Sequence, residues 1–140
     1  MITRYKHRSD VPYSLHDMRI EKICFEDGTI SFQFANGYVS TKSPYSQVDG
    51  SLRIEKVDPD FAVVFLLSDN GYMGEFKGCK MSMDDFLRRY DDLSIEIIDE
   101  LYGYNSVAYG GYLNLPDRND LIEIQMSFYH EGDIVFETEE

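Results

Sequence analysis

The chain has 140 residues, of which 43% are hydrophobic and 14% aromatic, and this composition argues against a disordered polypeptide. The length fits one domain, so we expect residues 1–140 to fold around a single core. A formal net charge of −13 argues against nucleic acid partners, because phosphate contacts need a basic surface.

Membrane insertion is also not expected. The sequence has no apolar run near the roughly 20 residues that a membrane-spanning helix needs. The opening segment MITRYKHRSD lacks the apolar centre of a signal peptide. We therefore expect a cytoplasmic protein, with Cys24 and Cys79 as buried free thiols.

The first elements in chain order form a predicted β-hairpin. Residues 1–11 are polar and locally basic, which indicates a mobile arm or an edge segment. Residues 18–39 then show the period-two alternation of half-buried strands on either side of Asp27-Gly28, a pair that tolerates the positive φ angles of a type I′ turn. A break in the alternation predicts a bulge near Glu21-Lys22, and Asn36-Gly37 is expected to close the hairpin as a second positive-φ pair.

The middle of the chain contains two further predicted strands. Residues 43–50 are a loop by composition, and a strand beginning at Leu52 is expected to stop at Asp58-Pro59-Asp60. Residues 61–67, FAVVFLL, form an unbroken apolar run whose length favours a strand buried on both faces.

One helix is predicted, over residues 83–92. Ser82 can cap its N-terminus, and Asp84 and Asp85 lie in the first turn, where the helix dipole favours anions. Residues 93–104 fit a strand or a helix, and their three isoleucines favour the strand. The last 50 residues are predicted to form a meander of antiparallel strands, with Gly110-Gly111 interrupting the strand at 107–115. The expected class is α+β, predominantly antiparallel β, as a twisted sheet or a sandwich built from hairpins.

No catalytic or metal-binding pattern stands out in the sequence. His16-Asp17 suggests a metal dyad, but the remaining histidines, His7 and His130, lie in a polar arm and a turn. A structural role is therefore expected, with Asp17 capping local backbone and His16 half-buried. The cysteines and glycines lack nucleophile or phosphate-loop motifs. We expect a non-enzymatic protein without a cofactor or a metal.

The distinctive feature is the charge of the last third of the chain. Residues 1–90 carry 12 basic and 13 acidic residues, whereas residues 91–140 carry 13 acidic residues and one basic residue, Arg118. Four tyrosines lie within eleven residues of the same third, and tyrosine is enriched in the centres of protein interfaces. The candidate partner-binding residues are Tyr102, Tyr104, Tyr109, Tyr112, Asp91, Asp92, Asp99, Glu100 and Glu123. Ordinary packing of the tyrosines in the sheet is the alternative interpretation.

The first part of the chain resembles a known class of proteins. The order Leu15-His16-Asp17, a first strand, an acidic turn and a second strand ending in Asn36-Gly37-Tyr38 is similar to small acidic immunity-like proteins, which bacteria encode beside polymorphic toxins. The resemblance covers roughly residues 1–40. It implies a non-enzymatic protein that neutralises a toxin domain by covering it.

The sequence therefore favours a protein-binding module with an acidic, tyrosine-rich face for a basic protein, such as an immunity protein that binds a basic toxin. One alternative is a β domain that binds a small ligand, or acts on it, in an internal aromatic pocket. The other is a homo-oligomer in which the tyrosine strand pairs with its own copy across a two-fold axis.

Overall fold

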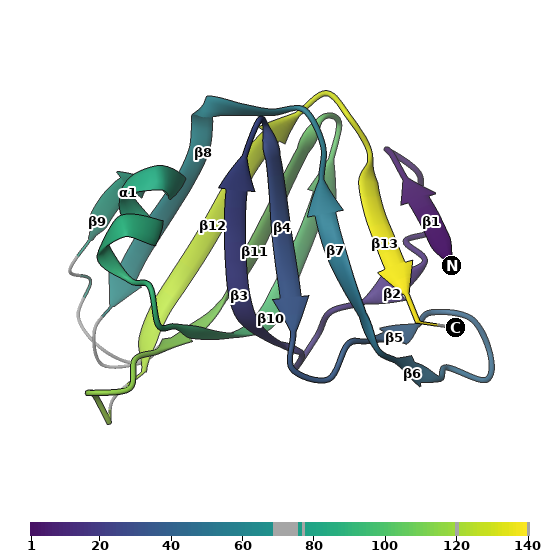
Figure 1. The fold of residues 1–140 in the computed structure, drawn as a ribbon, viewed down its shortest axis with the longest axis horizontal. Helices are drawn as coiled ribbons and strands as arrows, with labels where there is room; N and C mark the ends of the chain where they lie inside the picture. Colours follow the sequence, from purple (N-terminus) through teal and green to yellow (C-terminus); the bar gives the residue numbers. More distant parts are fainter. Residues whose placement is uncertain (69–75, 77, 120, 140) are drawn as a thin grey trace.

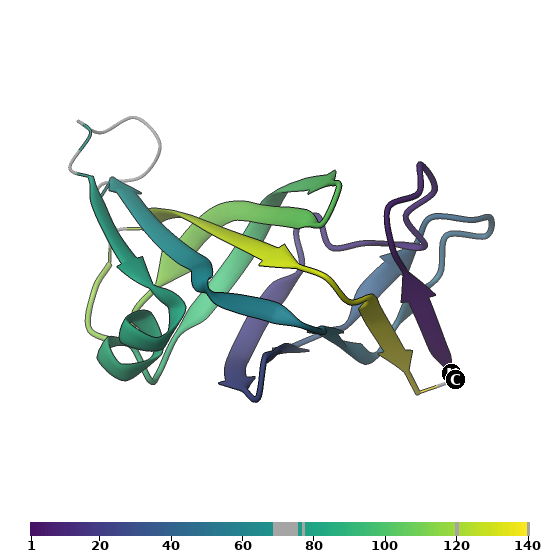
Figure 2. The same ribbon diagram turned by 90° about the horizontal axis from the view of Figure 1, so that it is seen from above.

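The computed structural model describes residues 1–68, 76, 78–119 and 121–139. Ten strands form one antiparallel sheet that folds over into two packed layers, and the described residues contain one short helix (Figures 1 and 2). The predicted α+β class, mostly antiparallel β with one main helix, is confirmed.

Each layer contains five strands. The first layer holds, in spatial order, β1 (Ile2–Tyr5), β13 (Ile134–Thr138), β7 (Gly50–Ile54), β4 (Thr29–Phe34) and β3 (Arg19–Glu26). The second layer holds β10 (Ser94–Gly103), β11 (Ser106–Asn114), β12 (Ile122–His130), β8 (Val57–Ser68) and β9 (Cys79–Ser82). A separate small sheet contains β2 (Tyr13–Ser14), β5 (Tyr38–Ser40) and β6 (Gln47–Val48).

The two layers are joined along both sides. On one side Ile20 of β3 pairs with Ile95 of β10. On the other side β7 continues into β8, and β12 continues into β13, so that one bent two-stranded ribbon belongs to both layers (Figure 1). The amide of Glu55 donates to the carbonyl of Asp133 at 3.0 Å and holds the bend together.

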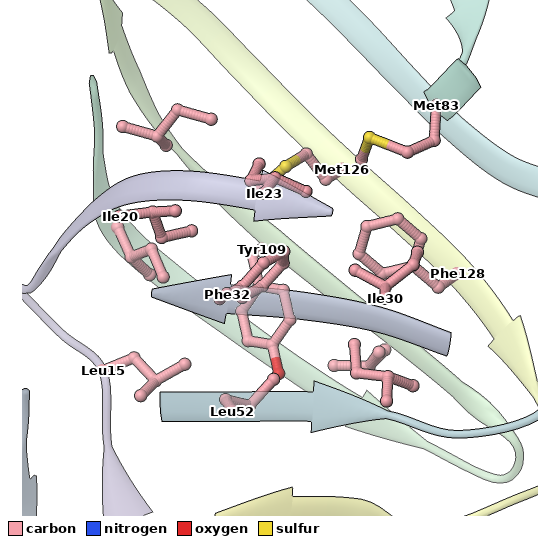
Figure 3. Close-up of a cluster of buried hydrophobic side chains, with 14 of the residues drawn as sticks. Leu15, Ile20, Ile23, Ile30, Phe32, Leu52, Met83, Tyr109, Met126 and Phe128 are labelled. Carbon is pink, nitrogen blue, oxygen red and sulfur yellow. The ribbon is translucent and has the colours of Figure 1, made fainter. Parts of the chain in front are cut away.

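The core lies between these layers. Figure 3 shows Phe32 and Leu52 from the first layer meeting Tyr109, Met126 and Phe128 from the second. All five side chains are at most 2% exposed, and the ring centroids of Phe32 and Tyr109 are 5.6 Å apart in an edge-to-face contact. This packing follows from period-two alternation, because every second residue of each strand points inward.

The predicted hairpin is present as β3 and β4. Asp27 and Gly28 have φ angles of 52° and 75°, as a type I′ turn requires, and the register shifts between Ile20 and Lys22, which confirms the bulge. The expectation for Asn36-Gly37 is only partly correct. Gly37 has a φ of 67°, but the following strand, β5, leaves the hairpin and joins the small sheet.

The helix α1 (Met83–Arg89) begins as predicted and ends three residues earlier than expected. The hydroxyl of Ser82 accepts a hydrogen bond from the amide of Asp85 at 3.1 Å, which is the geometry of an N-cap. Met83 and Phe86 are buried, so the helix covers one end of the layered core.

Two expectations for residues 57–68 are wrong. Asp58-Pro59-Asp60 does not end a strand, because β8 runs through these residues. The register shift between Ala62 and Val57 leaves Pro59 without a ladder partner, so its missing amide hydrogen is tolerated. The apolar run is also not buried on both faces. Ala62 and Val64 point into the core, but Phe61 is 62% exposed.

The strand prediction for residues 93–104 is confirmed by β10, and the predicted meander is present as β10, β11 and β12. The expected return of residues 134–136 along β12 is wrong, because β13 continues into the first layer and pairs with β7 and β1. Gly110-Gly111 does not interrupt β11. The register irregularity lies instead in β10, between Ile97 and Asp99. A Cβ on Gly111 would lie 1.9 Å from the Glu96 carbonyl oxygen, so this glycine permits close approach of the bulged strand.

Tyr38 connects the small sheet to the main one. Its buried hydroxyl donates to the Ser51 carbonyl at 2.7 Å and lies 3.2 Å from the Glu137 carbonyl, and its ring packs against Tyr13 and Phe136. The opening segment lies at the same end of the molecule, where β1 pairs with β13 as an edge strand.

Replacing Tyr38 by Phe is expected to lower the free energy of unfolding by about 1 kcal/mol, because the hydrogen bond from its hydroxyl to the Ser51 carbonyl is lost. Urea denaturation followed by circular dichroism measures this change. The matched control is Tyr45→Phe at a side chain that is 64% exposed, for which a change within about 0.5 kcal/mol is expected. Equal stability of the two variants would contradict the assigned role of Tyr38.

Candidate interaction face

The candidate site is the outer surface of the second layer, on the side away from the core. Strand pairing aligns outward-pointing residues of neighbouring strands in rows, so residues far apart in the sequence become neighbours. One row contains Glu96, Tyr112 and Glu123. The next contains Asp99, Gly110 and Gln125, and it continues to Phe65 of β8.

These rows place three carboxylates around one tyrosine. We call Glu96, Asp99, Tyr112 and Glu123 the acidic half of the face. Arg19 of β3 lies at its border, 3.9 Å from the Glu96 carboxylate, and donates to the Ser94 hydroxyl at 2.9 Å. The carboxylates of Asp99 and Glu123, together with the tyrosine between them, can attract cationic groups of another molecule.

Only part of the predicted tyrosine cluster reaches this face. Tyr109 is 1% exposed and belongs to the core, whereas Tyr112 is half-buried on the outer side. A bulge at Gly110-Gly111 would turn both tyrosines to one side. Because β11 is regular there, residues three apart point to opposite faces.

The bulge in β10 decides where the other predicted residues point. Glu100 and Tyr102 follow it and lie on the inner side, where the Tyr102 hydroxyl donates to the Glu100 carboxylate at 2.8 Å. Burial raises the pKa of both Tyr102 and Tyr109, so both phenols stay protonated. The ring of Tyr102 stands edge-to-face against Tyr5, with centroids 5.5 Å apart.

The last three predicted residues lie outside the face. Tyr104 is 72% exposed at the turn between β10 and β11, where its ring contacts His7 with centroids 5.1 Å apart. Asp91 and Asp92 are exposed between α1 and β10. The nine predicted residues are therefore distributed over a face, a core, a turn and a loop.

Sequence reasoning missed an apolar groove beside the acidic half. Phe61, Val63, Ala108, Ser127 and Tyr129 line this groove, which has a volume of about 420 Å³ and also includes Phe65 at its border. Ser127 pairs with both Ala108 and Val63, so small side chains form its floor. The sequence carries no signal for it, because residues 61–65 are all apolar, and only the strand pairing shows that every second side chain there points outward.

Large apolar side chains surround this groove. Phe61 is 62% exposed and Tyr129 is 38% exposed, and their ring centroids are 6.4 Å apart. Leu101, which pairs with Ala108 across the ladder, is 64% exposed. Exposed apolar side chains that are contiguous on one surface are typical of interaction sites.

A second acidic surface lies on the outer side of the first layer. An open groove of about 530 Å³ there is lined in part by Glu21, Asp49, Glu137 and Glu139. Basic side chains neutralise part of the charge on this layer: Arg53 lies 3.2 Å from Glu137, and Arg4 lies 2.9 Å from Glu55 and 3.1 Å from Asp133.

The structure provides no metal centre among the described residues, in which no group of three or more His, Cys, Asp or Glu side chains is placed to hold an ion. His16 is exposed rather than half-buried. Its Nδ1 lies 2.8 Å from the Ile98 carbonyl and its Nε2 lies 3.4 Å from Asp17. Cys24 and Cys79 are free thiols, but Cys24 is only half-buried and Cys79 is exposed.

Comparison with known proteins gives no relative: no family model, curated protein or solved structure matches this chain. Within the described part of the chain, no helix has the length and apolarity to cross a membrane. The candidate site is therefore assigned from geometry and chemistry.

The pKa values of His16 and His130 are expected to differ, because the surroundings of the two rings shift them in opposite directions. The bond to the Ile98 carbonyl raises the pKa of His16, with Asp17 adding to the effect, whereas burial lowers the pKa of His130. His16 therefore stabilises the fold below its ordinary pKa of about 6.5, and this contribution is lost as pH rises through its folded pKa. His130 stabilises the fold above its ordinary pKa, and this contribution is lost as pH falls.

Proton NMR titration, with His16→Gln and His130→Gln for assignment, measures both values. His16 is expected to titrate above about 6.5 and His130 below it. The reverse order would show that the contacts assigned to these rings do not hold in solution.

Proposed function

We propose that the protein is a binding module that captures a basic protein through the acidic half of the outer face. The supporting observation is the gathering of Glu96, Asp99 and Glu123 around Tyr112 by the pairing of three strands. Charged groups arranged in this way accelerate encounter with a partner of opposite charge, and a tyrosine at their centre supplies contact area after encounter.

A rigid support favours this function. Binding is strongest when the contact residues are already held in position, because less conformational entropy is then lost. Tyr112 and Glu123 lie on β11 and β12, which are hydrogen-bonded to each other, and the inner side of both strands is anchored by buried Leu113, Ile122 and Ile124. The acidic half is thus presented by the core itself rather than by loops.

The finer proposal is that the partner is a basic toxin domain, such as a nuclease, which the protein neutralises by covering it in the cytoplasm. Support comes from the resemblance of residues 1–40 to immunity-like proteins and from the net charge of −13. A nuclease presents a basic surface to nucleic acid, and a surface carrying carboxylates competes for it.

The geometry gives less support to the two alternative functions, which are ligand binding in an internal pocket and assembly with a second copy. An internal ligand pocket needs space between the layers, where Phe32, Tyr109 and Phe128 pack against one another (Figure 3). Self-pairing of the tyrosine strand needs a free edge, but β11 is paired with β10 along one side and with β12 along the other.

A photo-cross-linking amino acid in place of Tyr112, introduced in the native host, is expected to identify a basic partner by mass spectrometry. With that partner purified, Asp99→Lys combined with Glu123→Lys is expected to slow association about tenfold at low ionic strength and to flatten its salt dependence. Stopped-flow or surface plasmon resonance measures the rate.

The matched control is Glu21→Lys combined with Glu139→Lys, which makes the same change in net charge on the acidic groove of the opposite layer. Compared at about 0.1 M ionic strength, this control is expected to change the association rate much less, because salt then screens charges beyond about 10 Å. If the control slows association and the Asp99 and Glu123 changes do not, the acidic half is not the binding surface.

A further inference from the structure

We propose that the apolar groove is the second half of the same binding face, and that the partner carries a large apolar side chain beside its basic cluster. This inference rests on the proposed function and specifies the chemistry of the partner. The protein would then recognise two features at a fixed separation rather than positive charge alone.

The separation follows from the strands that both halves share. Tyr112 of the acidic half and Ala108 in the floor of the groove lie on the outer side of β11, four residues apart. A strand advances about 3.3 Å per residue, so their separation is about 13 Å. One surface of modest size can therefore contact both halves at once.

The groove is shaped for a side chain rather than for an added strand. Ala108 and Ser127 keep its floor low, while Phe61 and Tyr129 stand beside them. The underlying strands β11 and β12 are paired along both sides in this region, so their backbone groups are already used. An apolar anchor packed among aromatic side chains is the usual energetic centre of a protein interface.

Charge selects a basic protein over a second copy of this chain. With a two-fold axis through the centre of the face, the acidic half of each copy would cover the apolar groove of the other. Carboxylates would then lose water without gaining cationic partners, which is unfavourable. A partner with lysine or arginine beside an apolar side chain satisfies both halves.

The test uses two synthetic peptides of identical composition. In the segregated peptide, a lysine cluster and a Phe-Leu-Phe cluster are joined by a Gly-Ser spacer long enough to span about 13 Å. In the mixed peptide the same residues alternate. Fluorescence anisotropy is expected to show at least about tenfold tighter binding of the segregated peptide to the wild-type protein.

Ala108→Glu separates the groove from simple charge attraction. This change fills the floor of the groove and adds negative charge, yet it is expected to weaken binding of the segregated peptide about tenfold. The matched control is Ser31→Glu, in the outer row of β4 on the opposite layer, with binding unchanged. Phe61→Ser combined with Leu101→Ser provides a second test, since both side chains are more than 60% exposed and their loss spares the core.

The outcomes distinguish this inference from the proposed function. If both peptides bind equally, and only Asp99→Lys with Glu123→Lys weakens them, the groove has no role and the acidic half remains supported. If neither peptide binds the wild type at millimolar concentration, the two-part face is wrong. The inference would also be overturned if sedimentation showed the wild type as a dimer and Ala108→Glu as a monomer. A second copy of the chain would then be the occupant of the groove.

Discussion

The bent ribbon formed by β7–β8 and β12–β13 is the constraint on which the structure depends. Each of its two segments crosses from one layer to the other, so the layers cannot separate without breaking the ladder between residues 50–68 and 123–138. The bond from Glu131 to the Lys56 carbonyl, at 3.0 Å, lies at the bend together with the Glu55 bond. Because the ribbon fixes both layers, it also fixes which side of β12 faces the core and which side faces solvent.

The local elements could be predicted from the sequence, because their signals lie within a few residues. Asp27-Gly28 specifies a turn, Ser82 specifies a helix start, and the alternating residues of β12 specify a strand. The sequence could not show that only one face of β8 is buried. A uniformly apolar run and an alternating run can both form a strand, but a uniformly apolar run does not indicate which face is exposed. The pairing of β8 with β12 places Val63 opposite Ser127, on the side that faces the groove rather than the core.

The candidate site was predictable only in part, for a related reason. The charge of residues 91–140 and the tyrosines pointed to β10, β11 and β12, the strands that carry the candidate face, but the direction of each side chain depends on where the bulge lies. A bulge in β10 instead of β11 places Tyr109 inside and Tyr112 outside, and turns Glu100 inward beside Tyr102. The apolar groove combines Phe61, Ala108 and Tyr129 from three strands, and no local pattern in the sequence brings these residues together.

The fold also changes the meaning of the uneven charge. Along the sequence the last third is almost entirely acidic, yet Asp133 and Glu137 of that third meet Arg4 and Arg53 from the first half of the chain. These pairs neutralise part of the charge on the outer side of the first layer within the molecule. The acidic half of the second layer has Arg19 at its border, beside Glu96, while Asp99 and Glu123 lie one to two strands further away. These arginine contacts thus compensate more carboxylates on the first layer than in the acidic half of the second, which supports the proposed capture of a cationic partner there. The second layer also carries the apolar groove.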